Sequence, residues 1–450
     1  MRETFEGADA NADLRAGLLD ARTRTLALLE GLDPEEHRAR RAWRRQDEAL
    51  TLLQLSIVNP LLWEAGHIAW FHERFVLRDL DRKPPIRPDA DALYRSLDVP
   101  PDARWSLDLP PLQTTLGYMA VVQDEVVGRL QRGPMSPHAR EVQAIGILHE
   151  DMHDETLVYG RQTLGYPAPG FAVPPGPALA AGPLPGDVAI PGGRFRLGAE
   201  PGHGGLVLDN EKWAHEVAVK PFRIARAPVT NAEFAAFVAD GGYRARRFWD
   251  DVGWHWRSET GAQHPLYWIT EGPGWQTRQF DRIVALAPHQ PVSHVSWHEA
   301  KAFCRWAGRR LPTELEWEVA AAAEPAASGG LGSVKRRYPW GAAAPGIAYA
   351  NLDGRLLGTV DVAAFAAGDS AFGCRQMIGN VWEWTDSAFL PYPGFVPGPY
   401  KAYSEPWFGP LKVLRGGCFA TRGRLTSNLY RNFFPPDRRD LFAGLRTCAL

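Results

Sequence analysis

The sequence predicts two domains of different fold class, a bundle of four helices followed by a mixed α+β domain with much irregular structure. The chain has 450 residues, more than one ordinary hydrophobic core accommodates. Long segments with helically spaced apolar residues occupy its first third. Proline and glycine are dense over residues 167–186, and the sequence pattern changes beyond them. We therefore expect domains at 1–166 and 187–450, joined by a linker at 167–186.

Four segments of the first domain carry the signals of helices. The first lies between residues 10 and 50, has a stripe of leucines, and meets a stop signal at Gly31. The second begins at Asn59-Pro60 and continues through LLWEAGHIAWFHERFVLRDL. The third runs from Leu112 to Gln131, and the fourth from Pro137 to about Leu164. Helices of this length with polar outer faces pack most simply as an antiparallel bundle.

The second domain has shorter elements. Residues 188–197 have the pattern of a strand, a turn and a strand. Helices are expected from Asn231 and from Ser296. A further helix is expected after Thr313, because Thr313 and Glu316 have the spacing of a capping box. Short helices among strands and turns are typical of an α+β domain.

Composition and charge narrow the classes of partner. The formal net charge is -2, so neither nucleic acid nor an anionic membrane is expected as the main partner. No apolar run approaches the ~20 residues of a membrane span, and the N-terminus lacks a signal-peptide pattern, which predicts a cytoplasmic protein. The four cysteines form no CxxC pair, so we expect free, buried thiols. No sequence feature indicates an oligomeric state.

A pair of histidines in the fourth helix is the main chemical signal. His149 and His153 are four residues apart, so a helix places both imidazoles on one face, where they can bind one metal ion. The segment also matches H-E-x-x-H, the zinc-protease signature. Such a protease takes its third ligand downstream, where the nearest histidine is His203, beyond the proline-rich segment.

His67 in the second helix is the better third ligand. Three tryptophan and phenylalanine side chains next to it would exclude solvent: Trp63, Trp70 and Phe71. The alternative is that His67 is an ordinary core histidine. His72 is offset from His67 by about 140° on a helix, so we expect it at the surface. Glu73 and Glu155 are candidates to accept an imidazole N–H, or else belong to a solvated helix face.

The motifs taken together resemble a known family. NPLLWEAGHIAWFHE and HEDMHDE are similar to the N-terminal DinB-like four-helix bundle of the iron(II) sulfoxide synthases of ergothioneine biosynthesis. The C-terminal half resembles the formylglycine-generating-enzyme, or sulfatase-modifying-factor, domain, which has a C-type-lectin-like fold. The motifs that carry this second resemblance are IPGGRF at 190, PVTNAEF at 228, PVSHVSW at 291, RLPTELEWE at 310, GNVWEWT at 379 and VLRGG at 413.

The resemblance implies an active site. His67, His149 and His153 would be the ligands of Fe(II), and the chain would be an O2-dependent oxidoreductase that attaches a chalcogen donor to the imidazole of hercynine (Nα-trimethylhistidine). Tyr400 and Tyr403 resemble the family's Tyr-x-x-Tyr loop, which supplies an active-site phenol that can donate a proton. The alternative for each tyrosine is packing in a loop.

The resemblance also implies substrate contacts. Asn432 and Arg438 lie in YRNFFPPDR, which is similar to the family segment that binds the amino-acid end of the substrate. A trimethylammonium group needs aromatic faces or a carboxylate. Phe433, Trp382 and Trp384 are candidates for the aromatic faces, although the two tryptophans are also typical of a structural core. True formylglycine-generating enzymes use a cysteine pair after the Arg-Gly-Gly motif, but Thr421 and Thr426 stand there in this chain. The second domain is therefore expected to act as wall and lid of the pocket, without copper chemistry.

Departures from the family pattern concern the donor. Phe433-Phe434 replaces the Trp-Asp of synthases that use γ-glutamylcysteine, so the acidic contact to that donor is missing. Met152 stands where many synthases have Gln. The combination is most similar to the selenoneine synthase branch, which takes a selenosugar and forms a hercynyl selenoxide. The alternative is an ergothioneine sulfoxide synthase that uses cysteine or γ-glutamylcysteine. A zinc hydrolase and a non-catalytic binding protein are the remote alternatives.

Overall fold

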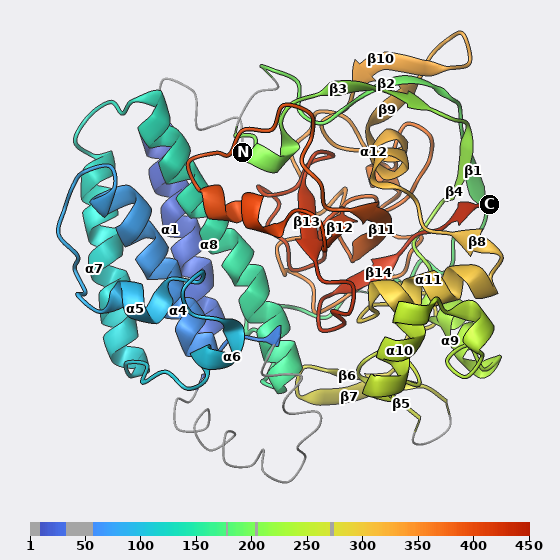
Figure 1. Ribbon diagram of the computed structural model, residues 1–450, viewed down its shortest axis with the longest axis horizontal. Coiled ribbons are helices and arrows are strands. Elements are labelled where there is room, and N and C mark those ends of the chain that lie inside the picture. Colours follow the sequence, from blue (N-terminus) through green and yellow to red (C-terminus); the bar gives the residue numbers. More distant parts are fainter. Residues whose placement is uncertain (1–9, 33–56, 177–178, 203–205, 271–273) are drawn as a thin grey trace. The chain divides into compact units, whose positions relative to one another are not determined.

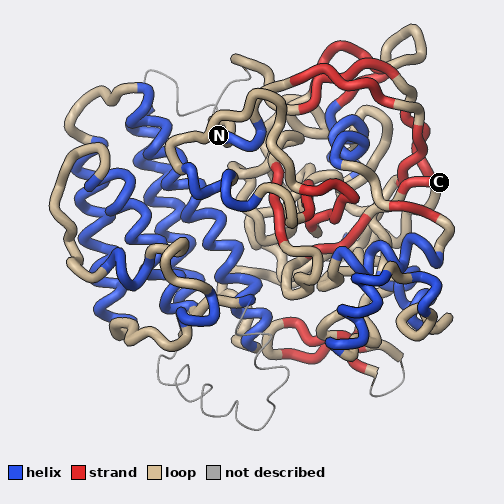
Figure 2. The backbone as a smooth tube through the Cα atoms, viewed as in Figure 1, coloured by secondary structure: helices blue, strands red, loops and turns tan. Residues whose placement is uncertain are grey.

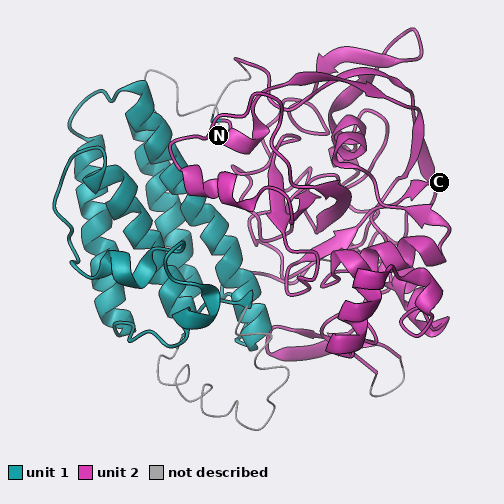
Figure 3. Cartoon of the chain, viewed as in Figure 1, with its two compact units in different colours: residues 1–171, 204–206 teal, residues 172–203, 207–450 magenta. Residues whose placement is uncertain are grey.

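The structure is a computed structural model that describes residues 10–32, 57–176, 179–202, 206–270 and 274–450. The chain divides into two compact units (Figure 3). Unit 1 comprises residues 1–171 with 204–206, and unit 2 comprises residues 172–203 with 207–450. The change of unit after residue 171 falls inside the segment 167–186, whose bounds as a linker stay a prediction.

Unit 1 is the predicted helical bundle (Figures 1 and 2). Its long helices are α1 (Ala10–Leu29), α4 (Leu61–Phe71), α7 (Leu112–Leu130) and α8 (Pro137–Leu164). Two short helices, α5 (Ala90–Tyr94) and α6 (Pro101–Arg104), lie in the connection between α4 and α7. Helix α1 packs along α8, and α4 packs against both α7 and α8. Residues 33–50 of the first predicted helix lie outside the described residues.

Local signals define the ends of α8, the longest of these helices. The Ser136 hydroxyl accepts a hydrogen bond from the Ala139 N–H at the N-terminus, and Pro137 occupies the first helical position. At the C-terminus Gly165 adopts a left-handed conformation with φ 70°. The 28 residues between these ends form one helix, so His149 and His153 lie on a continuous scaffold.

Helix α4 is buried on nearly all sides, and this overturns the prediction for His72. Every residue of α4 except Leu62 is buried, as a helix that is apolar all round requires. A π-helical segment, η3 (His72–Arg78), continues it. His72 is 1 % exposed, and its Nε2 lies 3.0 Å from Glu150 Oε2 of α8. The predicted surface position was wrong because α4 has no solvent face, so an offset of 140° from His67 still points into the bundle.

Unit 2 is the predicted α+β domain. One four-stranded sheet has the order β1 (Asp187–Ile190), β4 (Phe222–Ala225), β15 (Cys448–Ala449), β8 (Arg309–Arg310). The other has the order β13 (Arg431–Phe434), β12 (Lys412–Arg415), β11 (Trp382–Ala388), β14 (Ala443–Leu445). Strand β11 pairs antiparallel with β12 and parallel with β14.

Smaller sheets and helices complete unit 2. The smaller sheets are β2 (Gly193–Leu197) with β3 (His215–Val219), β5 (Trp268–Ile269) with β6 (Gln276–Gln279) and β7 (Arg282–Ala285), and β9 (Ala323–Pro325) with β10 (Leu331–Lys335). The helices are α9 (Asn231–Ala239), α10 (Asp251–Thr260), α11 (Trp297–Trp306) and α12 (Glu314–Ala322). The capping box predicted at Thr313 and Glu316 begins α12.

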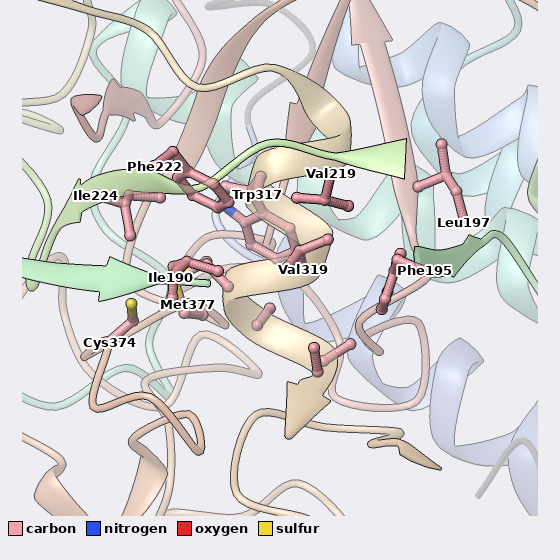
Figure 4. Close-up of a cluster of buried hydrophobic side chains, with 14 of the residues drawn as sticks. Ile190, Phe195, Leu197, Val219, Phe222, Ile224, Trp317, Val319, Cys374 and Met377 are labelled. Carbon is pink, nitrogen blue, oxygen red and sulfur yellow. The ribbon is translucent and has the colours of Figure 1, made fainter. Parts of the chain in front are cut away.

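The core of unit 2 is centred on α12 (Figure 4). Trp317 of α12 is fully buried in a cluster that includes Ile190, Phe222 and Met377. Its indole N–H donates to Glu383 Oε2 of β11 at 2.8 Å. The hydrogen bond satisfies the one polar atom of the ring, so the cluster stays apolar without an unpaired donor. All four cysteines are free and buried, as expected.

Candidate metal centre

The structure brings together the three histidines that the sequence singled out. His67 comes from α4, and His149 and His153 come from adjacent turns of α8. One ring nitrogen from each lies within 4.8 Å of the others. The Nε2 atoms of His149 and His153 are 3.2 Å apart. Among the described residues this is the one cluster of His, Cys, Asp and Glu side chains with the geometry of a metal site.

Hydrogen bonds on the far side of the rings set the orientation of His67 and His153. His67 Nδ1 donates to the backbone carbonyl of Tyr94 at 2.7 Å. A carbonyl oxygen can only accept, so the proton lies on Nδ1 and the lone pair of His67 is on Nε2. His153 Nδ1 donates in the same way to Glu64 Oε2 at 2.5 Å. Partners of this kind fix both the tautomer and the plane of a metal-binding imidazole.

Glu64 takes the role that was predicted for Glu73. The Glu73 carboxylate instead accepts hydrogen bonds from the Tyr118 hydroxyl and the Ile86 N–H. Because a carboxylate so engaged is directed at α7 and the chain after η3, the prediction for Glu73 was wrong. Glu64 accepts from a histidine of another helix, so no local spacing pointed to this role. Glu155 is buried on α8, and its role stays a prediction.

The electrostatics suit neutral ligands. Burial, with a smaller contribution from His153, holds the pKa of His67 and of His149 well below 6.5. Both rings are therefore uncharged at neutral pH and can offer a lone pair. Two imidazole nitrogens bound about 2.1 Å from one ion lie about 3.0–3.4 Å apart at bond angles between 90° and 109°. The separation of 3.2 Å between the two Nε2 atoms falls in this range, so the residues fit a nitrogen-liganded metal ion.

Aromatic side chains wall the cluster, as the sequence predicted. The Trp63 ring stacks on His67 with centroids 4.6 Å apart, and the Trp70 ring stacks at 5.4 Å. Phe71 stacks on His149 at 3.7 Å. These faces remove water from the rings and strengthen electrostatic interactions at the centre.

Glu150 of the HEDMH segment is turned away from the histidines. Its carboxylate accepts hydrogen bonds from Arg22 Nε at 2.8 Å and from the Thr25 hydroxyl at 2.8 Å, both on α1. Burial opposes its ionisation, but Arg22 and His72 hold the pKa of Glu150 well below its usual range. A zinc protease of the H-E-x-x-H type needs this glutamate as general base at the metal. The structure gives it a structural role between α1 and α8, which argues against the hydrolase.

The predicted tyrosines lie in unit 2 on a loop that we call the tyrosine loop, residues 398–404. Tyr400 and Tyr403 are half-buried, with ring centroids 6.4 Å apart. Buried Asp209 holds both ends of the loop: its Oδ2 accepts from the Gly398 N–H at 3.2 Å and its Oδ1 from the Ser404 hydroxyl at 2.6 Å. Asp209 was not predicted, because 189 residues separate it from Gly398.

The predicted substrate residues of unit 2 lie on and after β13. Phe433 stacks on Phe389 at 3.9 Å and meets the edge of Tyr403 at 5.9 Å. Asn432 is half-buried, and its Oδ1 accepts a hydrogen bond from the Phe433 N–H at 2.9 Å. The structure therefore brings Phe433 and Tyr403 together within unit 2.

Two further residues of the predicted set have structural partners. The Arg438 guanidinium lies 5.1 Å from the Phe434 ring and forms two hydrogen bonds of 2.6 Å with Asp440. Trp382 is 1 % exposed and packs beside Tyr430 in the sheet. The contact of Trp382 with a trimethylammonium group stays a prediction. Met152 is half-buried on α8 between the two histidines.

Comparison with known proteins places both units. Residues 18–157 match the DinB superfamily, and residues 175–449 match the sulfatase-modifying factor enzyme 1-like domain. The hercynine oxygenase of Mycolicibacterium thermoresistibile is 41 % identical over an alignment of 450 residues, which covers 97 % of this chain and 94 % of that protein. The chain belongs to the hercynine oxygenase family.

Other relatives agree with this placement. The hercynine oxygenase of Mycolicibacterium smegmatis is 38 % identical over 95 % of this chain and 96 % of its own length. The formylglycine-generating enzyme of Streptomyces coelicolor is 36 % identical but covers only 56 % of this chain and 84 % of its own. Hercynine oxygenases thus match both units of the chain, whereas the formylglycine-generating enzyme matches little more than half.

No helix of the described residues has both the length and the apolar character needed to pass through a lipid bilayer.

Proposed function

We propose that the chain is an O2-dependent synthase that uses iron(II) to join selenium from a selenosugar to the imidazole of hercynine. Two observations support the proposal. Three histidines in unit 1 have the geometry of a nitrogen-liganded metal centre. Relatives that are named hercynine oxygenases align with 97 % and 95 % of the chain. The histidine cluster is the observation that carries the proposal, because it is the group of residues able to hold the metal.

The proposed reaction balances without a further reductant. Hercynine loses the hydrogen on the imidazole carbon between the two ring nitrogens, and the selenol of the donor loses its hydrogen. A carbon–selenium bond forms, one oxygen atom of O2 becomes the selenoxide oxygen, and the other leaves as water with the two hydrogens. The two substrates lose four electrons in total, and O2 takes up the same number.

The residues of unit 1 would hold the metal and exclude water. His67, His149 and His153 would bind the ion through neutral imidazoles, and the Tyr94 carbonyl and Glu64 would keep two of the rings in place. Bound iron(II) would supply the coordination positions and the redox chemistry that O2 and the substrates require. Three protein ligands leave positions open on a metal that accepts six.

Residues of unit 2 would complete the chemistry, and their roles rest on the family resemblance. We propose Tyr400 or Tyr403 as the phenol that donates a proton during the reaction. Asn432 would hydrogen-bond the carboxylate of hercynine, and Phe433 would offer an aromatic face to its trimethylammonium group.

The donor preference rests on positions 433, 434 and 152. Phe433 and Phe434 carry no charge, and the Arg438 guanidinium beside Phe434 is already paired with Asp440. Met152 cannot donate a hydrogen bond. These side chains suit a neutral sugar better than the charged γ-glutamylcysteine. Cysteine and γ-glutamylcysteine remain the alternative donors.

A parallel turnover assay tests the proposal. The purified protein is loaded anaerobically with iron(II), mixed with hercynine and O2, and offered 1-seleno-glucose, cysteine or γ-glutamylcysteine in separate reactions. We expect hercynyl selenoxide as the main product by mass spectrometry. A preference for cysteine would overturn the selenium donor but keep the hercynine chemistry, and the absence of any hercynine-derived product with all three donors would overturn the function.

A further inference from the structure

Three aromatic side chains along one face of α4 each donate a hydrogen bond from a ring nitrogen to the short helix α5. Trp63, His67 and Trp70 follow at spacings of four and three residues, so their rings lie in one row. Trp63 Nε1 donates to the Leu93 carbonyl, and Trp70 Nε1 donates to Asp91 Oδ1, each at 2.7 Å. His67 Nδ1 donates to the carbonyl of Tyr94 between them. Each ring of this row, including His67, is therefore held in position by its own hydrogen bond to α5.

Arg104 of α6 closes one end of this row. Its guanidinium carbon lies 3.9 Å from the centroid of the Trp63 ring. The Trp63 ring in turn stacks on His67, with 12° between the two ring planes, so its orientation matters for the metal centre. A shift of the guanidinium would let the Trp63 ring tilt, and the His67 ring would lose the surface that holds its plane.

Arg104 also reaches His153 through hydrogen bonds. Arg104 Nη1 donates to Asn59 Oδ1 at 2.7 Å, and Asn59 Nδ2 donates to Glu64 Oε1 at 2.5 Å. The second oxygen of Glu64 accepts from His153 Nδ1. Asn59 thus fixes the carboxylate that fixes the ring. Asn59 precedes α4 and Glu64 lies in its first turn, so both residues of this hydrogen-bond series belong to the start of the helix.

The guanidinium is itself held firmly. Arg104 is 7 % exposed, and its Nε and Nη2 atoms donate to the carbonyls of Val99 at 2.9 Å and Ser96 at 3.0 Å. A cation over the Trp63 ring that also donates from three separate nitrogens needs the fork of an arginine, which a lysine ammonium cannot reproduce.

We infer that Arg104 is a positioning residue of the metal centre, orienting His67 through Trp63 and His153 through Asn59 and Glu64. The inference rests on the proposed function only in requiring that the three histidines bind a metal. The inference gives the segment from α5 to α6, residues 90–104, a role in orienting two metal ligands, His67 and His153. Partners behind metal-binding histidines typically change metal affinity about 10–100-fold when they are lost.

Cobalt(II) titration tests the inference without turnover. Wild type and Arg104→Lys are titrated anaerobically with cobalt(II), following the visible ligand-field spectrum and the affinity in competition with a chelator. We expect about tenfold weaker binding and a changed spectrum for Arg104→Lys. The matched control is Arg161→Lys, because Arg161 is likewise buried in unit 1 and donates to the carbonyls of Leu28 and Glu30. The control is expected to keep the wild-type affinity and spectrum.

Two further variants separate the routes and guard against a folding defect. Asn59→Ala breaks the hydrogen-bond chain to His153 and leaves the stack in place. Trp63→Phe shortens the stack and removes the N–H donated to Leu93, but leaves the chain through Asn59 and Glu64 intact. Each is expected to weaken cobalt(II) binding about threefold or more. If Arg104→Lys does not fold, these two variants decide. Wild-type affinity and spectrum in both would overturn the inference, as would an unchanged spectrum in folded Arg104→Lys.

The outcomes also distinguish this inference from the proposed function. If wild type itself binds no cobalt(II) at the histidines, the proposed function fails first, and the inference falls with it. If wild type binds cobalt(II) and the variants match it, only the role of Arg104 is lost.

Discussion

The histidine cluster of unit 1 and the tyrosine loop of unit 2 are built in opposite ways. The histidines stand on two helices, and hydrogen bonds that two of the rings donate to Glu64 and the Tyr94 carbonyl hold them in place. The tyrosines stand at a short 3-10 turn, η8 (Lys401–Tyr403), and the backbone around them is tied down by one carboxylate, Asp209. Side chains on packed helices are placed more accurately than side chains on loops. The comparison teaches that the metal centre depends on several separate partners behind its ligands, whereas the loop depends on a single anchor.

Removing a histidine of the cluster should have the largest effect. His149→Ala is expected to lower bound iron below about one tenth of wild type and to abolish O2-dependent turnover, because it deletes one of three ligands. Iron content after anaerobic loading and desalting measures this. His138→Ala is the matched control, since His138 is an exposed histidine on the same helix and should leave the iron content unchanged. Stoichiometric iron in His149→Ala would show that His149 is not a metal ligand and would contradict the account of the histidine cluster.

Removing a phenol should spare the metal and slow the chemistry. Tyr403→Phe is expected to lower kcat about 10²-fold with unchanged iron binding, because a positioned proton donor typically contributes about 10²–10⁴-fold. Steady-state rates of Tyr400→Phe and Tyr403→Phe, measured side by side, identify the donor. We expect the larger loss for Tyr403, whose ring contacts Phe433. Wild-type kcat in both variants would remove the loop from the catalytic account.

Weakening the anchor of the tyrosine loop should have an intermediate effect. Asp209→Asn keeps the shape of the side chain but replaces one acceptor oxygen with an N–H group, so it can no longer accept from both Gly398 and Ser404. We expect a fall in kcat of about tenfold with iron binding intact, smaller than for loss of the phenol. Glu405→Gln serves as control, since Glu405 is exposed next to Ser404. Equal rates for Asp209→Asn and Glu405→Gln would show that the loop does not need its carboxylate.

The smallest effect is expected for Asp91 of α5, which accepts a hydrogen bond from Trp70 beside the histidine cluster. It concerns the pH dependence of the free energy of unfolding. A hydrogen bond from Arg78, against a smaller opposing effect of burial, lowers the pKa of Asp91 from 3.8 to about 2. Ionised Asp91 therefore stabilises the fold above pH 4, and this contribution is lost as the pH falls through about 2. Because the Asp91 side chain is 45 % exposed, Asp91→Asn should cost only about 0.5–1 kcal/mol at pH 7. Urea unfolding should show a smaller difference between the two proteins at pH 3, and a larger difference there would contradict the assignment.

The sequence predicts the features that depend on short spacings. The spacing of His149 and His153 required only that α8 be a helix, and Ser136 and Gly165 mark its ends. The predicted capping box at Thr313 begins α12, and the helix expected from Ser296 is α11. Two domains of different class follow from the change in pattern after residue 166.

Features that depend on distant parts of the chain were not predictable. His72 was misplaced because the pattern of one helix does not reveal that its neighbours cover every face. Glu64 was missed because its acceptor role appears only when α4 lies beside α8. Strand β15 at the C-terminus pairs with β4, more than 200 residues earlier, and no local signal specifies such a pairing. Helix α10 escaped notice because only its Gly253 is buried, so it has no apolar stripe.

X-ray absorption at the iron edge tests the central claim most directly. Wild-type protein loaded anaerobically with one equivalent of iron(II) should show the multiple-scattering signature of imidazole, fitted by three histidine nitrogens with light atoms in the remaining positions. A spectrum dominated by sulfur or carboxylate oxygen, with fewer than three imidazoles, would contradict a metal centre formed by His67, His149 and His153.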